Sequence, residues 1–157
     1  MAGKGYVPSA QVKKETVVGT RKQLGAAGEE IAARYLTAQG CTIISRNWRA
    51  SDGGFGRELA GEIDLIVEES APNMVNGRAL EMWRVLVEVR TRRGDRFCTA
   101  LQSITPAKAR KMRALAAAYV QSSGWKGPWR IDVVAIQMDS RGVMQAVEHI
   151  RGAVQDA

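Results

Sequence analysis

The chain has 157 residues, of which 45% are hydrophobic and 25% are charged, as expected for one globular domain with a substantial core. No apolar run approaches the roughly 18 residues of a membrane span, and the N-terminus lacks the apolar segment of a secretory signal. Two cysteines and a single histidine exclude a disulfide framework and most histidine-based metal sites, so a cytoplasmic protein is expected.

The charge is strongly basic, with a formal net charge of +7 and an isoelectric point of about 9.8. Most of the excess lies in two segments, residues 1–23 and residues 101–126. A basic surface suits a nucleic-acid backbone, because neutralised phosphates release counterions. A solvated surface of a basic protein explains the charge equally well.

Residues 1–20 predict a flexible basic tail, because they are small, polar and charged without any periodicity. A single domain is expected over residues 21–150, and residues 151–157 form a C-terminal tail. We assign no chemistry to either tail.

Residues 21–39 predict a helix that ends at Gly40. Its apolar stripe consists of Leu24, Ala27, Ile31 and Tyr35. At 100° per residue, Glu30 lies on the wet face with Arg34, whereas Glu29 lies on the flank of the buried stripe. Glu29 is therefore the acid expected to face a sheet, unless it is a boundary glutamate that reaches water.

Residues 41–49 predict a strand, and the glycine-rich residues 50–60 predict a loop. The segment from residue 61 to residue 92 then predicts two strands joined by a long, mobile loop over residues 69–81. Because side chains alternate across a strand, Glu62 and Asp64 share one face in the first strand. In the second strand, Glu88 and Arg90 share a face.

A second helix is expected from Thr105, a capping hydroxyl followed by proline, to about residue 121. Its apolar stripe carries Lys108 at the N-terminal end, where the side chain either covers the core or contacts phosphate. Strands are predicted over residues 129–138 and 143–150. Asp132, in the strand over residues 129–138, is more readily a partner of Arg130 than a catalytic acid. His149, in the strand over residues 143–150, is expected at the surface because this strand is predicted to lie at the edge of the sheet.

An acid inside each of two apolar strands needs a metal ion, a cation or water, because an unpaired buried carboxylate is costly. Asp64 and Glu88 can hold a Mg²⁺ or Mn²⁺ ion, with the Val89 carbonyl and Glu29 completing its shell. Arg90 then faces the attacking water or the transition state. Two structural salt bridges, one of them between Glu88 and Arg90, explain the same spacing.

Several motifs, in the same order, resemble the bacterial YraN-type family, uncharacterised protein family 0102. They are G-E-E-I-A-A-R-Y-L from Gly28, R-N-W-R from Arg46, G-E-I-D-L-I from Gly61, V-E-V-R-T-R from Val87, Lys108 before the long helix, and R-I-D-V-V from Arg130. That family is similar to restriction-endonuclease-like nucleases and Holliday-junction resolvases. The resemblance implies an α/β fold with a mixed β-sheet flanked by helices, an αβββαβ core, with Asp64 and Glu88 as metal ligands and Glu29 as an accessory acid.

The chain departs from the family at one position, where the lysine of the E-V-K-T-R motif is Arg90. Arginine keeps the charge but cannot deprotonate near neutral pH. We therefore expect either a metal-dependent endodeoxyribonuclease, in which Arg90 stands in for the lysine, or a DNA-binding or interaction module that has lost catalysis. A structural partner of a larger assembly, without nucleic-acid contact, is a third option. Phosphate contacts are assigned to Arg92, Lys108 and Lys111, and by analogy with resolvases a homodimer remains open.

Overall fold

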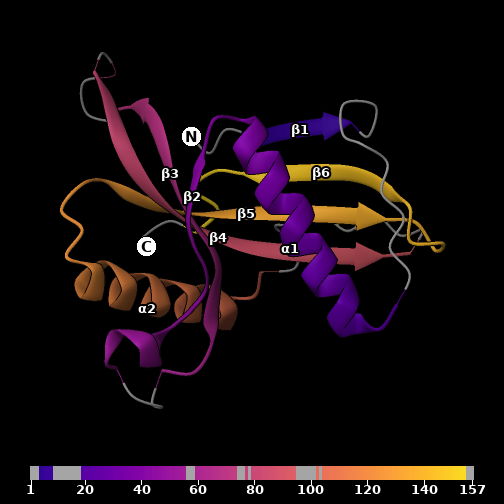
Figure 1. Cartoon of the computed structure of the whole chain (residues 1–157), viewed down its shortest axis with the longest axis horizontal. Coiled ribbons are helices and arrows are strands. Elements are labelled where there is room, and N and C mark those ends of the chain that lie inside the picture. Colours follow the sequence, from indigo (N-terminus) through magenta and orange to yellow (C-terminus); the bar gives the residue numbers. More distant parts are fainter. Residues whose placement is uncertain are drawn as a thin grey trace.

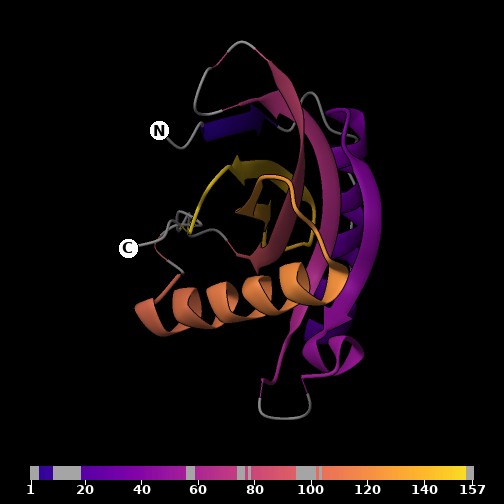
Figure 2. The same cartoon turned by 90° about the vertical axis from the view of Figure 1, so that its left-hand side faces the viewer.

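The computed structural model describes residues 4–8, for which only the backbone is considered, together with 19–55, 59–73, 77, 79–94, 102 and 104–154. Six strands form one mixed sheet in the order β1-β6-β5-β4-β3-β2. Helices α1 and α2 cover opposite faces of this sheet (Figures 1 and 2). The order α1-β2-β3-β4-α2-β5 is the predicted αβββαβ core, which confirms the restriction-endonuclease-like α/β fold class.

Helix α1, Arg21–Ala38, begins with a capping box in which Thr20 and Gln23 each satisfy the other's backbone N–H. Its buried side is made of small and apolar residues: Gly28, Ile31, Ala32, Ala33, Tyr35 and Leu36. The short side chains bring the helix axis close to the sheet. The predicted helix over residues 21–39 is confirmed within one residue.

The hairpin of β3, Glu62–Pro72, and β4, Leu80–Arg93, is longer than the sequence suggested. The antiparallel pairing continues to Pro72↔Leu80, so the prediction of a mobile loop over residues 69–81 was wrong. The arm has no buried face, since residues 69–72 and 80–83 are all half-buried or exposed, and it contains Pro72, so it lacks the apolar pattern that predicts a strand. The hairpin projects beyond the body of the sheet (Figure 1).

Strand β2, Thr42–Arg49, pairs with β3, and the 3₁₀ turn η2, Ala50–Gly53, follows it. Helix α2, Pro106–Ser123, begins at Thr105, whose hydroxyl accepts the N–H of Lys108 at 3.2 Å, and ends at Gly124 in a left-handed conformation. The predicted start of this helix is therefore confirmed. None of the described helices is long and apolar enough to cross a membrane.

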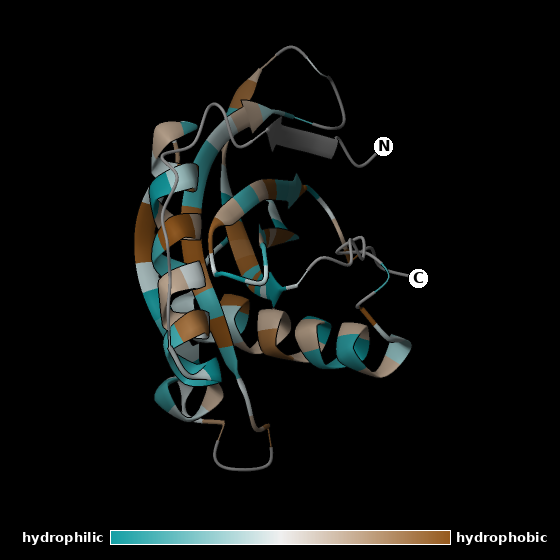
Figure 3. Ribbon diagram, turned by 90° about the vertical axis from the view of Figure 1, so that its right-hand side faces the viewer, coloured by the Kyte–Doolittle hydropathy of each residue, from teal (hydrophilic) through white to brown (hydrophobic). Residues whose placement is uncertain are grey.

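Strands β5, Trp129–Met138, and β6, Met144–Ile150, complete the core. β5 runs parallel to β4 because α2 provides the crossover. The sheet separates two apolar clusters, one under α1 that includes Leu36 and Val87, and one under α2 that includes Leu86 and Leu115. Figure 3 shows the corresponding hydrophobic bands along both helices and the strands.

Two predictions about the far edge of the sheet were wrong. Strand β1, Lys4–Pro8, pairs with β6 where residues 1–20 were expected to be a flexible tail. β6 is consequently flanked on both sides, and His149 is fully buried rather than at the surface. A five-residue strand held by backbone pairing leaves no periodic signal in the sequence, so neither feature was visible there.

Candidate functional site

The sheet opens where the two acid-bearing strands separate. The pairing of β3 with β4 ends at Leu65↔Val87, one step before Asp64 and Glu88. Beyond this point β3 continues beside β2, whereas β4 continues beside β5 as far as Arg93↔Met138. Figure 1 shows the two pairs of strands leaving each other near the centre of the molecule. Asp64 and Glu88 thus flank the opening, as the sequence predicted.

Asp64 reaches across this opening to β4. Its Oδ2 accepts a hydrogen bond from the backbone N–H of Val89 at 2.7 Å, which takes the place of the missing ladder bond. Burial and the negative charge of Glu88 raise the pKa of Asp64 from 3.8 to about 7, although the Val89 hydrogen bond acts in the opposite direction. The folded protein therefore holds an acid that resists ionisation.

Glu88 forms the ion pairs of the site. One of its oxygens, Oε1, lies 2.8 Å from Nζ of Lys108 and 3.6 Å from Nε of Arg90. Lys108 arrives from the first turn of α2, whereas Arg90 comes from the same face of β4 because the strand period is two. Both the salt bridge to Arg90 and the placement of Lys108 beside the acids were predicted, but the direct pairing of Lys108 with Glu88 was not.

Glu29 approaches the opening from α1. Burial and the charge of Glu62 raise its pKa, a hydrogen bond from Asn47 lowers it, and Glu88 also contributes to the increase. Asn47 itself has a φ of 51°, a left-handed conformation that asparagine tolerates better than most residues. Glu30 points outward and binds Arg46 at 2.7 Å, so the angular distinction between the two glutamates is confirmed.

The position of Glu29 depends on a close contact between two motif residues. A Cβ placed on Gly28 would lie 1.8 Å from Oγ1 of Thr91 and 3.0 Å from its Cβ. Only glycine therefore allows α1 to approach β4 this closely. Thr91 faces α1, which leaves Glu88, Arg90 and Arg92 on the other face of β4, toward α2.

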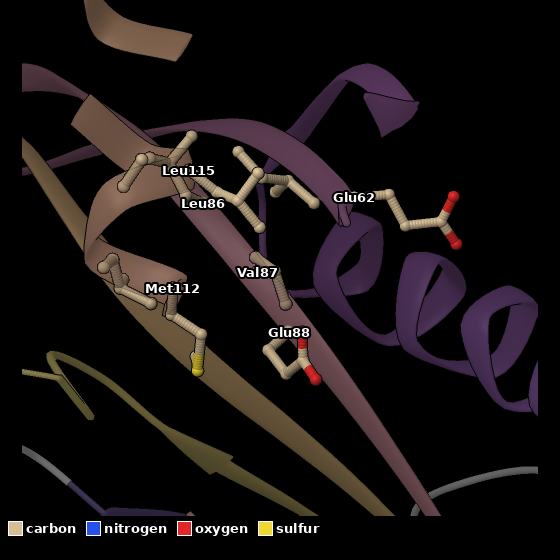
Figure 4. Close-up of a pocket in the computed structure, with 9 residues that line it drawn as sticks. Glu62, Leu86, Val87, Glu88, Met112 and Leu115 are labelled. Carbon is tan, nitrogen blue, oxygen red and sulfur yellow. The ribbon is translucent and has the colours of Figure 1, made fainter. Parts of the chain in front are cut away.

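A fourth carboxylate, Glu62, stands at the same opening and was not assigned a role from sequence. With Glu88 it borders a cavity of about 20 Å³, large enough for one water molecule. Figure 4 shows its carboxylate pointing away from the apolar side chains of Leu86, Met112 and Leu115 that line this cavity. The alternation that pairs Glu62 with Asp64 on one strand face was the available signal.

Lys111 of α2 lies against Gly61, the residue before Glu62. Its Cε would be 2.8 Å from a Cβ on Gly61, whose φ of 122° also favours glycine. Arg92 lies further along β4 on the surface, and Arg49 pairs with Glu62 at 3.3 Å. The predicted phosphate-binding residues Arg92, Lys108 and Lys111 therefore lie along the α2 side of the opening.

The donors at the opening fit a hard divalent cation. Two carboxylates on neighbouring strands are sufficient for Mg²⁺, which retains several water ligands. A cation would offset both the burial of Asp64 and its repulsion by Glu88, which are the causes of the raised pKa. Among the described residues, however, no three His, Cys, Asp or Glu side chains are already grouped as a metal centre, and Glu88 is paired with Lys108.

The third strand acid, Asp132, is separate from this site. It is fully buried and binds Arg130 Nε at 2.9 Å, His149 Nε2 at 2.8 Å and the N–H of Gly152 at 2.9 Å. Burial acts to raise its pKa, but hydrogen bonds from His149 and Arg130 outweigh this and lower it. Tyr35 of α1 packs edge-on against His149, so this network lies on the α1 face and supports the structural interpretation.

Comparison with known proteins places the chain in a family. The model of the Uncharacterised protein family UPF0102 matches residues 28–136, which contain α2, most of α1 and all the acids of the opening. The chain belongs to UPF0102. This result confirms the resemblance found in the sequence motifs.

Individual UPF0102 proteins match over most of their length. The UPF0102 protein of Roseiflexus castenholzii is 38% identical over 143 residues, covering 90% of this chain and 100% of the relative. The relative from Rhodococcus jostii is 40% identical, with coverage of 83% and 94%, and that from Streptomyces coelicolor is 38% identical, with coverage of 86% and 91%. The chain is therefore similar to these UPF0102 proteins over nearly their whole length.

Proposed function

We propose that this UPF0102 member binds DNA and hydrolyses its phosphodiester bonds with the help of Mg²⁺ or Mn²⁺. The observation that carries the proposal is the convergence of Asp64 and Glu88 where β3 and β4 separate, with the pKa of Asp64 raised to about 7. Perturbed carboxylates at one opening are characteristic of functional sites. The fold class is compatible with this activity, which the site itself must justify.

In this proposal Asp64, Glu88 and the carbonyl of Val89 hold the ion. When bound, the ion polarises the scissile phosphate and lowers the pKa of a coordinated water. Glu29 orients water at the opening from the α1 side. Asp64 must be ionised to serve, which favours activity above about pH 7.

Cations on the α2 side engage the DNA backbone. Arg90 stands 3.6 Å from Glu88 and takes the position of the motif lysine, where its guanidinium stabilises negative charge on the phosphate. Lys108, Lys111 and Arg92 extend this positive surface and contact flanking phosphates. Lys108 must leave Glu88, at least in part, to do so.

The alternative is a DNA-binding module without catalysis. It is favoured by one feature, the double pairing of Glu88 Oε1 with Lys108 and Arg90, which already neutralises the principal metal ligand. Arginine is also a poor substitute where the reaction needs a base. The two functions differ in metal uptake.

Isothermal titration with Mn²⁺ tests the proposal directly. Wild type should bind Mn²⁺, and Asp64→Asn should abolish binding while leaving the fold intact, because asparagine can still accept the Val89 N–H. Linear, supercoiled and four-way-junction DNA are then incubated with Mn²⁺ and either wild type or Arg90→Lys. Cleavage by wild type supports the nuclease.

Each other outcome has a definite meaning. Cleavage by Arg90→Lys alone would identify the natural chain as a degenerate nuclease. DNA binding without metal uptake would establish the binding module instead. Wild type that binds neither Mn²⁺ nor DNA would refute both functions, because phosphate contacts should be detectable at low salt.

A further inference from the structure

The ion pair between Lys108 and Glu88 joins two parts of the candidate site that have different roles. Glu88 is the proposed metal ligand on β4, and Lys108 is a proposed contact of the DNA backbone. The two are bound to each other, with Nζ of Lys108 2.8 Å from Oε1 of Glu88. A metal ion at Glu88 and a phosphate at Lys108 must therefore each compete with this contact.

Lys108 is nearer to Glu88 than Arg90 is. Its contact is a charge-assisted hydrogen bond, whereas Nε of Arg90 stands 3.6 Å from the same oxygen, beyond the usual range of a hydrogen bond. The side chain of Glu88 is only 12% exposed, so water screens these charges weakly. An ammonium group at this distance repels a divalent cation held by the same carboxylate. Lys108 and the metal ion are thus competitors for Glu88.

The backbone of Lys108 is fixed, whereas its side chain can move. The hydroxyl of Thr105 accepts the N–H of Lys108 at 3.2 Å, which holds this residue in the first turn of α2. Met112, one turn later, is buried in the cluster under α2 and lines the same small cavity as Glu88 (Figure 4). The side chain of Lys108 is flexible and 34% exposed, so its ammonium group can turn toward solvent without a shift of the helix.

A DNA phosphate offers Lys108 a second partner. If the ammonium group leaves Glu88 for water, a charge-assisted hydrogen bond to the protein is lost, whereas a move to a phosphate replaces that bond. DNA therefore lowers the free energy needed to release Glu88 for a metal ion. Because coupling between two ligands is reciprocal, the metal ion must strengthen DNA binding by the same factor.

We propose that Lys108 closes the metal site by pairing with Glu88, and that a DNA phosphate opens the site by taking this lysine, so that DNA and the metal ion bind cooperatively. This inference rests on the proposed function, of which it names the regulation. It favours metal binding by protein molecules that are already on DNA. The pairing of Glu88 with Lys108 is then a reversible closure of the site rather than a sign of lost catalysis.

The first test is isothermal titration of the DNA-free protein with Mn²⁺ at pH 8. Lys108→Met keeps the apolar stem but removes the ammonium group, and should bind Mn²⁺ about tenfold more tightly than wild type. Lys108→Gln removes the same charge and should behave in the same way, which provides a second variant if one does not fold. Arg110→Gln is the matched control, because Arg110 is exposed and lies about 200° around α2 from Lys108; its Mn²⁺ affinity should stay within about twofold of wild type.

The second test is the effect of Mn²⁺ on DNA affinity, measured by fluorescence anisotropy. The probe is a short labelled phosphorothioate duplex, which keeps the charge of the backbone and resists hydrolysis. Because Mn²⁺ also binds DNA, the change in affinity relative to EDTA is divided by the change found for Asp64→Asn, which lacks a metal ligand. The corrected gain in DNA affinity should be about tenfold larger in wild type and Arg110→Gln than in Lys108→Met.

The outcomes separate the closure from the proposed function. Mn²⁺ affinity in both Lys108 variants that is equal to or weaker than that of wild type, or equal corrected gains in DNA affinity, overturns the closure by Lys108 while the metal site survives. Failure of every protein to bind Mn²⁺, Lys108→Met included, refutes the proposed function itself. An increase in Arg110→Gln as large as that in Lys108→Met overturns the specific ion pair in favour of general charge repulsion.

Discussion

At the scale of single residues, the ionisation of Asp64 lowers the stability of the folded protein. Its carboxylate faces Glu88 across the opening and is partly removed from water, and these two effects raise its pKa from 3.8 to about 7. The folded state therefore keeps the proton that the unfolded state releases. Stability is lost as the pH rises between about 4 and 7, by at most about 1.4 kcal/mol per pH unit.

Asp64→Asn should consequently stabilise the protein at high pH. We expect a gain of about 2 kcal/mol in the free energy of unfolding at pH 8, less than the full linkage value because solvent reaches part of the side chain. At pH 4 the gain should vanish, since wild type then carries a neutral Asp64 as well. Urea unfolding at the two pH values measures both numbers, and an Asp64→Asn protein less stable than wild type at pH 8 would contradict the argument.

At the scale of elements, α1 is positioned by the absence of one side chain. Gly28 contacts Thr91 directly. Rotation of the threonine hydroxyl would not make room for a Cβ on residue 28, because the Cβ of Thr91 would still be only 3.0 Å away. The helix would have to move outward and carry Glu29 away from the carboxylates. Gly25 on the same helix has open space around it, with nothing within 4 Å of the position that a Cβ would occupy, and serves as a matched site.

Opposite effects are expected for the same substitution at the two glycines. Gly28→Ala should destabilise the protein by about 1–3 kcal/mol through overpacking, whereas Gly25→Ala should stabilise it by up to about 1 kcal/mol because alanine is the better helix former. The double variant Gly28→Ala with Thr91→Ala should recover part of the loss. Thermal or urea unfolding of the four proteins settles the point; equal effects at both glycines would exclude the close contact.

At the scale of the whole molecule, the two faces of the sheet carry different groups of charged residues. The α2 face presents the opening with Asp64 and Glu88 and the basic residues around it. The α1 face contains a buried ionic network in which Asp132 joins β5 to His149 of β6 and, through Arg130, to Glu69 of β3. This network holds β3, β5 and β6 together on the face of the sheet opposite the opening.

Asp132→Asn should therefore impair stability rather than the site. Removal of one partner leaves Arg130 and His149 undercompensated, at a cost of about 3–5 kcal/mol in the free energy of unfolding. Glu30→Gln, which breaks an exposed pair with Arg46, should cost less than about 1 kcal/mol. Where Asp132→Asn remains folded, its Mn²⁺ titration should match wild type; lost Mn²⁺ binding in a folded variant would place Asp132 in the site.

The sequence alone determined the features that depend on neighbouring residues. The caps and apolar faces of both helices, the angular difference between Glu29 and Glu30, and the alternation in β3 and β4 are all periodic or local patterns. The family motifs added the order of the elements. These signals were sufficient for the fold class and for the convergence of Asp64 and Glu88.

Only the tertiary structure decided the features that depend on pairing between distant segments. The end of the β3–β4 ladder at the acids, the edge strand β1, the burial of His149 and the pairing of Lys108 with Glu88 join residues that are far apart in the chain. Backbone hydrogen bonds between strands form with almost any side chain, and an ion pair can be satisfied by any nearby partner of opposite sign. Such contacts leave no periodic pattern in the sequence, because they are selected by the geometry of the assembled sheet.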